Sequence, residues 1–170
     1  MNKENVLREL EKIIAEVNVN TEYETAEENG LVDMLVTEFT EVDKNGNEVL
    51  GEMFFMPDAD NMYRYADFTV SLTITNEYDG TNLDVLLYAL NYINFNLPMG
   101  NFVISEDGTT ILLKHVIPVD PEADDAAIAD EIGYAVVKTL ACTALWMDTI
   151  FSVMSGVAGM EEVKKVLVGE

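Results

Sequence analysis

Hydrophobic side chains recur three and four positions apart in several stretches of the chain, with polar side chains between them. This spacing is typical of amphipathic helices, because it places the apolar residues on one side. Thr81 and Asp84 resemble a helix-capping pair, Pro98 and Gly100 follow as terminators, and Asp120-Pro121-Glu122 resembles a helix start. The predicted helices are residues 4–17, 81–97, 120–155 and 161–168.

Runs rich in β-branched and aromatic residues lie between these helices. Apolar residues occupy the even positions from 68 to 74 and polar residues the odd ones, which predicts a strand with one dry face. Asn45-Gly46 and Asp107-Gly108 suit tight hairpin turns, and Pro118 is expected to end the last strand. The acidic connector 18–30 is predicted to be a surface loop. The predicted strands are residues 31–41, 48–56, 67–75, 101–105 and 109–117.

The resulting order of elements is α-β-β-β-α-β-β-α, with hairpins dominating the connections. Hairpins favour antiparallel pairing, so we expect an α+β fold with an antiparallel sheet of about five strands and helices packed on one face. No internal repeat and no Pro- or Ser-rich linker interrupts the pattern. The sequence therefore predicts a single domain over residues 1–170.

The chain is strongly acidic, with 9 Lys and Arg against 32 Asp and Glu and a formal net charge of −23. Nucleic acids and anionic lipid surfaces are bound by clustered cations, and the most basic stretch here is Lys164-Lys165. We therefore expect no nucleic-acid partner. Hydrophobic residues make up 49% of the chain, which is typical of a folded protein rather than a disordered one.

Cys142 is the only cysteine, so an intramolecular disulfide and a Cys-x-x-Cys site are excluded, and we expect it to be a small buried hydrophobe. Residues 1–10 lack the apolar segment of a secretory signal, which favours the cytoplasm. Residues 139–160 are apolar apart from Asp148, but Thr, Ser and Gly dilute the stretch. We therefore expect no membrane association.

Candidate catalytic residues are few. His115 is the only imidazole and lies in a predicted strand, where a sheet or interface histidine is the expected role. Nucleophile-elbow, dinucleotide-binding and Walker motifs are absent from the sequence. The 32 acids leave room for a pair of catalytic carboxylates, but nothing singles one out.

Carboxylates prompt a search for a calcium site, because hard cations prefer oxygen ligands. Residues 43–47 begin like an EF-hand loop, but Glu48 stands where glycine is required, so a hairpin turn is the better interpretation. The acids at 58–60 and at 120–125 fit a weak calcium site less well than a solvated acidic surface. One His and one Cys exclude the usual zinc ligand set. The sequence predicts no catalytic residue, no metal site and no cofactor.

The predicted helix 81–97 has two apolar sides. Leu83, Leu86, Leu87, Leu90 and Ile93 form one stripe, expected to pack on the sheet, and Tyr88, Tyr92 and Phe95 lie nearly opposite. Large apolar patches are uncommon on soluble monomers, so the second side needs a cover. The cover is either the last helix of the same chain or the same helix of a second chain, and we favour a homodimer.

Strand 48–56 carries a second bulky run, Met53-Phe54-Phe55-Met56, which presents large side chains to both sides of the sheet. Core packing accounts for one side. Phe54 and Met56 are candidates for a patch that accepts a peptide, and the nine methionines of the chain would help such a surface adapt.

Residues 90–108 form a helix–strand–Asp-Gly–strand pattern, LNYINFNLPMGNFVISEDG, which a strand to Ile117 and a Pro-started acidic helix follow. With the order of elements, this pattern resembles the YbjN family, a relative of the type III secretion chaperone fold. The resemblance implies a small, acidic, cytosolic and dimeric protein. It also implies binding of extended partner segments on hydrophobic patches, without chemistry.

The sequence therefore favours a non-enzymatic, chaperone-like protein-binding module that acts as a homodimer and accepts a segment of another protein on a hydrophobic surface. Two alternatives stay open. One is a small-molecule-binding or metal-assisted enzyme whose carboxylates converge in a cleft, which a pocket of roughly 300 Å³ or more lined by converging acids would favour. The other is a structural subunit of a larger assembly.

Overall fold

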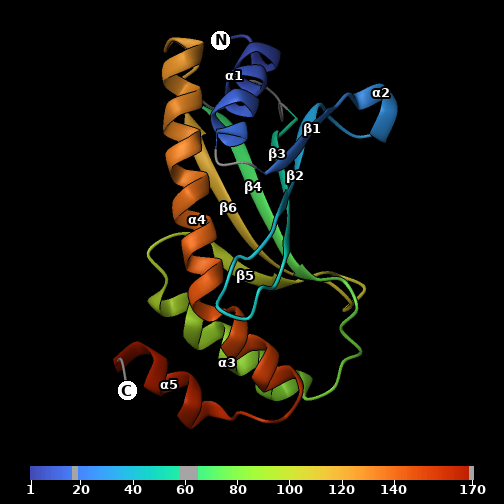
Figure 1. The fold of residues 1–170 in the computed structure, drawn as a ribbon, viewed down its shortest axis with the longest axis vertical. Coiled ribbons are helices and arrows are strands. Elements are labelled where there is room, and N and C mark those ends of the chain that lie inside the picture. The colour runs from blue at the N-terminus through green and yellow to red at the C-terminus, as the bar shows by residue number, and fades with distance from the viewer. Residues whose placement is uncertain (17–18, 58–64, 169–170) are drawn as a thin grey trace.

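The structure is a computed structural model that describes residues 1–16, 19–57 and 65–168, with side chains as far as residue 165. It has the predicted α+β class, with helices packed on an antiparallel sheet (Figure 1). The elements are α1 (Lys3–Ala15), β1 (Asn20–Glu24), α2 (Ala26–Asn29), β2 (Met34–Phe39), β3 (Val49–Phe55), β4 (Ala66–Thr75), α3 (Leu83–Asn96), β5 (Asn101–Ile104), β6 (Ile111–Val119), α4 (Asp125–Met154) and α5 (Met160–Val168).

The sheet has six strands in the order β1-β2-β3-β4-β6-β5, and every neighbouring pair is antiparallel. Strands β1 to β4 follow one another as a meander. The chain then leaves the sheet through α3, returns at the edge as β5 and turns back as β6 between β4 and β5. This order places β4 between β3 and the long strand β6.

Helices α1 and α4 cover one face of the sheet (Figure 1). The side chains that point to this face form the core, including Met53, Phe68 and Leu113, all of which are fully buried. The helices approach each other closely at Gly133, where an added Cβ would lie 3.1 Å from Cγ2 of Ile13. A glycine at this point therefore lets α1 lie against α4.

Helix α4 is, among the residues described, the one helix long and apolar enough to cross a membrane by length and composition. Its second half is mostly apolar and therefore needs cover from other parts of the protein. Trp146, Met147 and Ile150 are indeed buried in the core, whereas Tyr134 and Leu145 lie on the outer side and are exposed.

The connector 18–30 is not a plain surface loop, as predicted, but contains β1 and α2. β1 pairs with β2 at the sheet edge, with Tyr23 opposite Leu35. The alternation in β1 is weak because Glu22 and Glu24 face the side of the sheet without helices, and the edge position lets the remaining side chains stay half exposed. An edge strand of this composition lacks the apolar run that identifies a buried strand.

Two predicted boundaries in the second half are wrong. Pro118 does not end the last strand but lies within β6 opposite Asp67. β5 pairs with β6 only as far as Lys114, so Pro118 lies where β6 has a free edge, and its missing N–H costs no ladder bond on that side. α4 begins at Asp125 rather than at 120, because Asp124 caps it by accepting from the N–H groups of Ala126 and Ala127.

The predicted start of α3 is also wrong in detail. Thr81 and Asp84 form no capping pair: α3 begins after Asn82, which adopts a positive φ of 58° and makes no capping hydrogen bond with its side chain. Asp79 instead accepts from the N–H of Thr81 at 2.8 Å. The stabilising hydrogen bond therefore lies in the turn before α3, between Asp79 and Thr81, and not between Thr81 and Asp84 as the sequence pattern indicates.

Candidate functional site

Helix α3 lies at one end of the sheet, against α4 and β5, rather than flat on the sheet (Figure 1). This position buries Leu86, Leu90 and Ile93 as predicted. It leaves Leu83 and Leu87 exposed, which contradicts the prediction that they pack on the sheet. The reason is that a helix held at the end of a sheet buries a narrower stripe than one laid across it.

The opposite side of α3 contains the three aromatic residues singled out in the sequence. Tyr88 is 62% exposed and Phe95 is 89% exposed, whereas Tyr92 is half-buried and packs at the border of the core. We call Tyr88, Tyr92 and Phe95 the α3 aromatic face. A phenylalanine with this exposure gains no stabilisation from its own chain, so the surface is available to a second molecule.

The chain's own C-terminal helix covers this face only in part. The pKa of Lys164 in α5 is raised, first by its hydrogen bond to Glu161 and further by the nearby phenol groups of Tyr88 and Tyr92. α5 therefore runs beside this side of α3. The exposure of Tyr88 and Phe95 means that the first of the two expected covers, the last helix of the same chain, is wrong for these two residues.

The bulky run on β3 does present side chains to both sides of the sheet. Met53 and Phe55 are buried under the helices, and the ring of Phe55 meets that of Phe68 edge to face with centroids 4.9 Å apart. Phe54 is half-buried on the opposite side of the sheet, and Met56 is 39% exposed just beyond the end of β3. The two candidate residues are thus separated from the α3 aromatic face.

Phe54 belongs to a face of the sheet on which neither α1 nor α4 packs. Side chains at alternate positions of the strands point to this face, and several large apolar ones are exposed there, including Leu50, Val103 and Val116. We call this surface the open sheet face. It is a broad surface formed by several strands, whereas the α3 aromatic face lies on a single helix.

His115 lies on the helix-covered side of β6 and makes a structural contact. Its Nδ1 is 3.0 Å from Oγ1 of Thr139 in α4. The Thr139 hydroxyl donates to the carbonyl oxygen of Ala135 at 2.7 Å, so Nδ1 of His115 is the donor to Oγ1. Burial lowers the pKa of His115, which favours a neutral ring that ties β6 to α4. This geometry fits the expected role of a sheet histidine.

Cys142 is half-buried at the border of the core rather than fully buried, and burial raises the pKa of its thiol. A raised pKa keeps the thiol protonated, and a thiol is a poor nucleophile. The residue therefore fills space in α4, close to the role that the sequence predicts.

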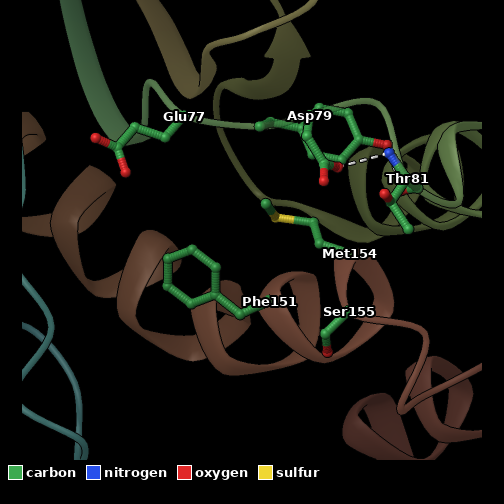
Figure 2. Close-up of a pocket in the computed structure, with 7 residues that line it drawn as sticks. Glu77, Asp79, Thr81, Phe151, Met154 and Ser155 are labelled. Atoms are coloured by element: carbon green, nitrogen blue, oxygen red, sulfur yellow. Dashed lines mark hydrogen bonds between the residues drawn. The ribbon is translucent and has the colours of Figure 1, made fainter.

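A pocket of about 380 Å³ lies between the β4–α3 turn and the end of α4, with Glu77, Asp79, Phe151 and Met154 among its lining residues (Figure 2). Its volume meets the size expected of an enzyme cleft, but its two acids do not converge. Asp79 is tied to the turn by Thr81, whose hydrogen bonds lower the pKa of the carboxyl, and Glu77 points away from Asp79 (Figure 2). A lowered pKa is the opposite of what a general acid requires.

A second pocket, of about 630 Å³, lies where the β2–β3 hairpin meets α4. Lys44 Nζ is 3.2 Å from Oδ2 of Asp148, and the side-chain amide of Asn45 donates to Oδ1 of the same carboxylate. Burial alone would raise the pKa of Asp43, but hydrogen bonds from Asn47 and Asn45 outweigh it and bring the pKa to about 2. The loop is a hairpin turn, as predicted, and it is docked on α4.

The acids considered for calcium have structural partners. Asp124 caps α4, and Asp125 accepts from the N–H of Asn2 and from the side-chain amide of Asn5, which ties the start of α1 to the start of α4. The acids at 58–60 lie outside the described residues. Within the described part of the chain, no three His, Cys, Asp or Glu side chains come together to hold a metal ion.

No protein-family model, curated protein or solved structure matches this chain. The resemblance to the YbjN family and the secretion chaperones therefore stays a prediction from the sequence.

Proposed function

We propose that this protein is a non-enzymatic, chaperone-like protein-binding module that acts as a cytoplasmic homodimer and accepts a segment of a partner protein on a hydrophobic surface. The observation that carries this proposal is the exposure of Tyr88 and Phe95 in the single chain. The resemblance of residues 90–108 to the YbjN pattern supports the same class. Exposed aromatic residues are typical of association surfaces, since their burial contributes much of the binding free energy.

A second copy is the occupant that best fits the α3 aromatic face. Two chains of net charge −23 repel each other, so they can approach closely only where each surface is nearly free of charge. α3 has one charged residue, Asp84, in its 14 positions. A two-fold interface that pairs α3 with α3 would bury the aromatic residues of both copies without bringing carboxylates together.

The partner segment is assigned to the surface around Phe54 and Met56, which lies away from α3. A dimer made through α3 therefore leaves this second surface free in both copies. The enzyme alternative gains no support from the described pockets, because the acids of the 380 Å³ pocket do not converge.

The mass of the protein in solution tests the dimer. Size-exclusion chromatography with light scattering should give twice the chain mass of 18.9 kDa, and Tyr88→Glu should reduce it to the single mass. Tyr134→Glu on α4 is the matched control, because Tyr134 is 64% exposed and Tyr88 is 62% exposed. A wild-type protein with the single mass, or a Tyr88→Glu variant that keeps the double mass, would contradict the dimer.

A further inference from the structure

The side chains of the open sheet face lie in rows across the strands. The face has an acidic half over β1, β2 and β3, and a half over β6 and β5 that carries exposed aliphatic side chains together with Lys114 and Asn101. In the first row Glu38 of β2 lies opposite Leu50, which lies opposite Thr73, then Leu112, and finally Val103 of β5. Leu50 is 40% exposed and Val103 is 36% exposed. The row therefore changes from a carboxylate at the β1–β2 side to exposed aliphatic side chains at the β5–β6 side.

The next row runs from carboxylates to polar side chains. Glu22 of β1 lies opposite Val36, which lies opposite Glu52 of β3, and Ser71, Lys114 and Asn101 complete the row. Glu22 is exposed and Glu52 is half-buried in the middle of the sheet. Four carboxylates, those of Glu22, Glu24, Glu38 and Glu52, thus lie over β1, β2 and β3 on this face.

A third row adds apolar surface on β6. Val116, which is 44% exposed, lies two residues beyond Lys114 on the same strand and on the same face, opposite Thr69. Lys114 is the one cation among the described residues that the register places on this face. The charge of the face is therefore negative, with four carboxylates over β1, β2 and β3 and a fifth, Asp67, on β4.

The dimensions of this face suit a helix. Neighbouring strands are about 4.8 Å apart, so the row from β2 to β5 spans about 19 Å, which is wider than a helix of about 10–12 Å. The other side of the same sheet already holds two helices, α1 and α4. An inner strand offers no free backbone groups to a ligand on its face, so an occupant has to bind through side chains.

We propose that the open sheet face binds a basic amphipathic helix of a partner protein. The apolar stripe of that helix covers Leu50, Leu112 and Val116, and its basic flank lies over Glu22, Glu38 and Glu52. This inference rests on the proposed function and names the partner class. A second copy of the chain fits this face poorly, because its own carboxylates would oppose those of the first copy.

The test uses a synthetic peptide of Leu and Lys at amphipathic helical spacing, about 18 residues long, so that it forms about five turns. Two control peptides carry Glu in place of Lys, or the same Leu and Lys in scrambled order. Binding to the full-length protein is followed by fluorescence anisotropy and calorimetry. We expect saturable binding of the amphipathic Lys peptide, and at least about tenfold weaker binding of both controls, equivalent to about 1.4 kcal/mol.

Charge substitutions on the protein locate the site. Glu52→Lys on the acidic half and Val116→Lys on the half over β6 and β5 should each weaken binding about tenfold or more. Glu131→Lys makes the same charge change as Glu52→Lys on the exposed side of α4 and should weaken binding less than about threefold. Circular dichroism and thermal melts show whether each variant is folded. If Glu52→Lys does not fold, Val116→Lys still tests the site, because Val116 is exposed.

The proposal is overturned if the amphipathic Lys peptide does not bind, if the scrambled peptide binds equally well, or if Glu131→Lys weakens binding as much as Val116→Lys. It is also overturned if Phe95→Lys abolishes binding and Val116→Lys does not, since the peptide would then lie on α3. Light scattering on the same variants separates the two ideas. If the protein forms a Tyr88-dependent dimer but does not bind the peptide, only the helix-binding inference is wrong. If the protein is a monomer that binds the peptide, only the dimer is wrong.

Discussion

The α3 aromatic face and the open sheet face are both exposed apolar surfaces, but they differ in where their charge lies. α3 has a single charged residue, and its aromatic residues project from a convex helix. The open sheet face spans several strands, and carboxylates on β1, β2 and β3 border its aliphatic part. In a chain of net charge −23, a surface with little charge suits another copy, and a surface with an acidic border suits a cation.

The largest expected effect comes from placing a charge on α3. The double substitution Tyr88→Glu and Phe95→Glu would strand carboxylates in an apolar contact, at a cost of several kcal/mol. We expect the dimer dissociation constant to rise by about a hundredfold or more, measured by analytical ultracentrifugation. Leu50→Glu on the open sheet face is the control and should leave the dimer unchanged. Equal dissociation by both changes would mean that the two surfaces do not act separately.

Salt should affect the two surfaces in opposite directions. Raising the salt concentration from about 0.05 to about 0.5 M shortens the range of charge interactions from over 10 Å to a few Å. Repulsion between the two acidic chains is then screened, so the dimer should tighten. Binding of the Leu–Lys peptide to the open sheet face should weaken by about tenfold, because attraction is screened. A dimer that dissociates at high salt would mean that ion pairs, rather than aromatic contacts, hold it.

Substitutions on the two faces of β6 should have smaller effects. The helices cover one of these faces, and the other belongs to the open sheet face. His115 on the covered side bonds Thr139 at 3.0 Å, and Thr139→Val would leave its Nδ1 without this partner. We expect a loss of about 1–2 kcal/mol in the free energy of unfolding, measured by urea denaturation. Val116→Thr on the open side should change it by less than about 0.5 kcal/mol. Equal losses would place Val116 under a cover as well.

The covered histidine also gives a pH dependence with a definite sign. Burial lowers the pKa of His115 below its ordinary value of 6.5, so near that pH the unfolded chain binds more protons than the folded one. Stability contributed by the neutral ring is therefore present above 6.5 and is lost as the pH falls through that value. Urea denaturation at about pH 7.5 and about pH 5 should show a larger loss for the wild type than for His115→Gln. Equal losses would contradict a neutral, buried ring.

The sequence predicts the sheet well where apolar residues alternate and predicts it poorly where they do not. β4 lies where the alternation at 68–74 predicts a strand, and its apolar residues face the core, but Thr69 and Ser71 on the predicted wet face are buried as well. β1, with Glu22 and Glu24 facing the open side, is not predicted at all. The exposure of Tyr88 and Phe95 follows from their helical spacing. That Leu83 and Leu87 are exposed with them depends on where α3 lies relative to α4 and β5, and a one-dimensional pattern does not contain that position.

The acidic half of the open sheet face could not be assembled from the sequence either. Glu22, Glu38 and Glu52 are 16 and 14 positions apart along the chain, and only the register of β1, β2 and β3 brings them together. The existence of β1 was itself missed, and so was its pairing with β2. The pairing register decides which residues of neighbouring strands share a row, and the hairpin geometry sets that register.

The smallest predicted effect concerns the centre of the open sheet face. Thr69 lies between Phe54 and Val116 in its row, and its buried Oγ1 has no hydrogen-bond partner within the described structure. An unsatisfied buried hydroxyl costs about 1–3 kcal/mol, and a methyl group of the same shape removes that cost. Thr69→Val should therefore raise the free energy of unfolding by up to about 1 kcal/mol. The control is Thr143→Val. The Thr143 hydroxyl donates to the carbonyl of Thr139 at 3.1 Å, so its removal should not stabilise the chain. If Thr69→Val destabilises the protein as Thr143→Val does, the Thr69 hydroxyl has a hydrogen-bond partner. The centre of the open sheet face is then more polar than the rows of side chains indicate.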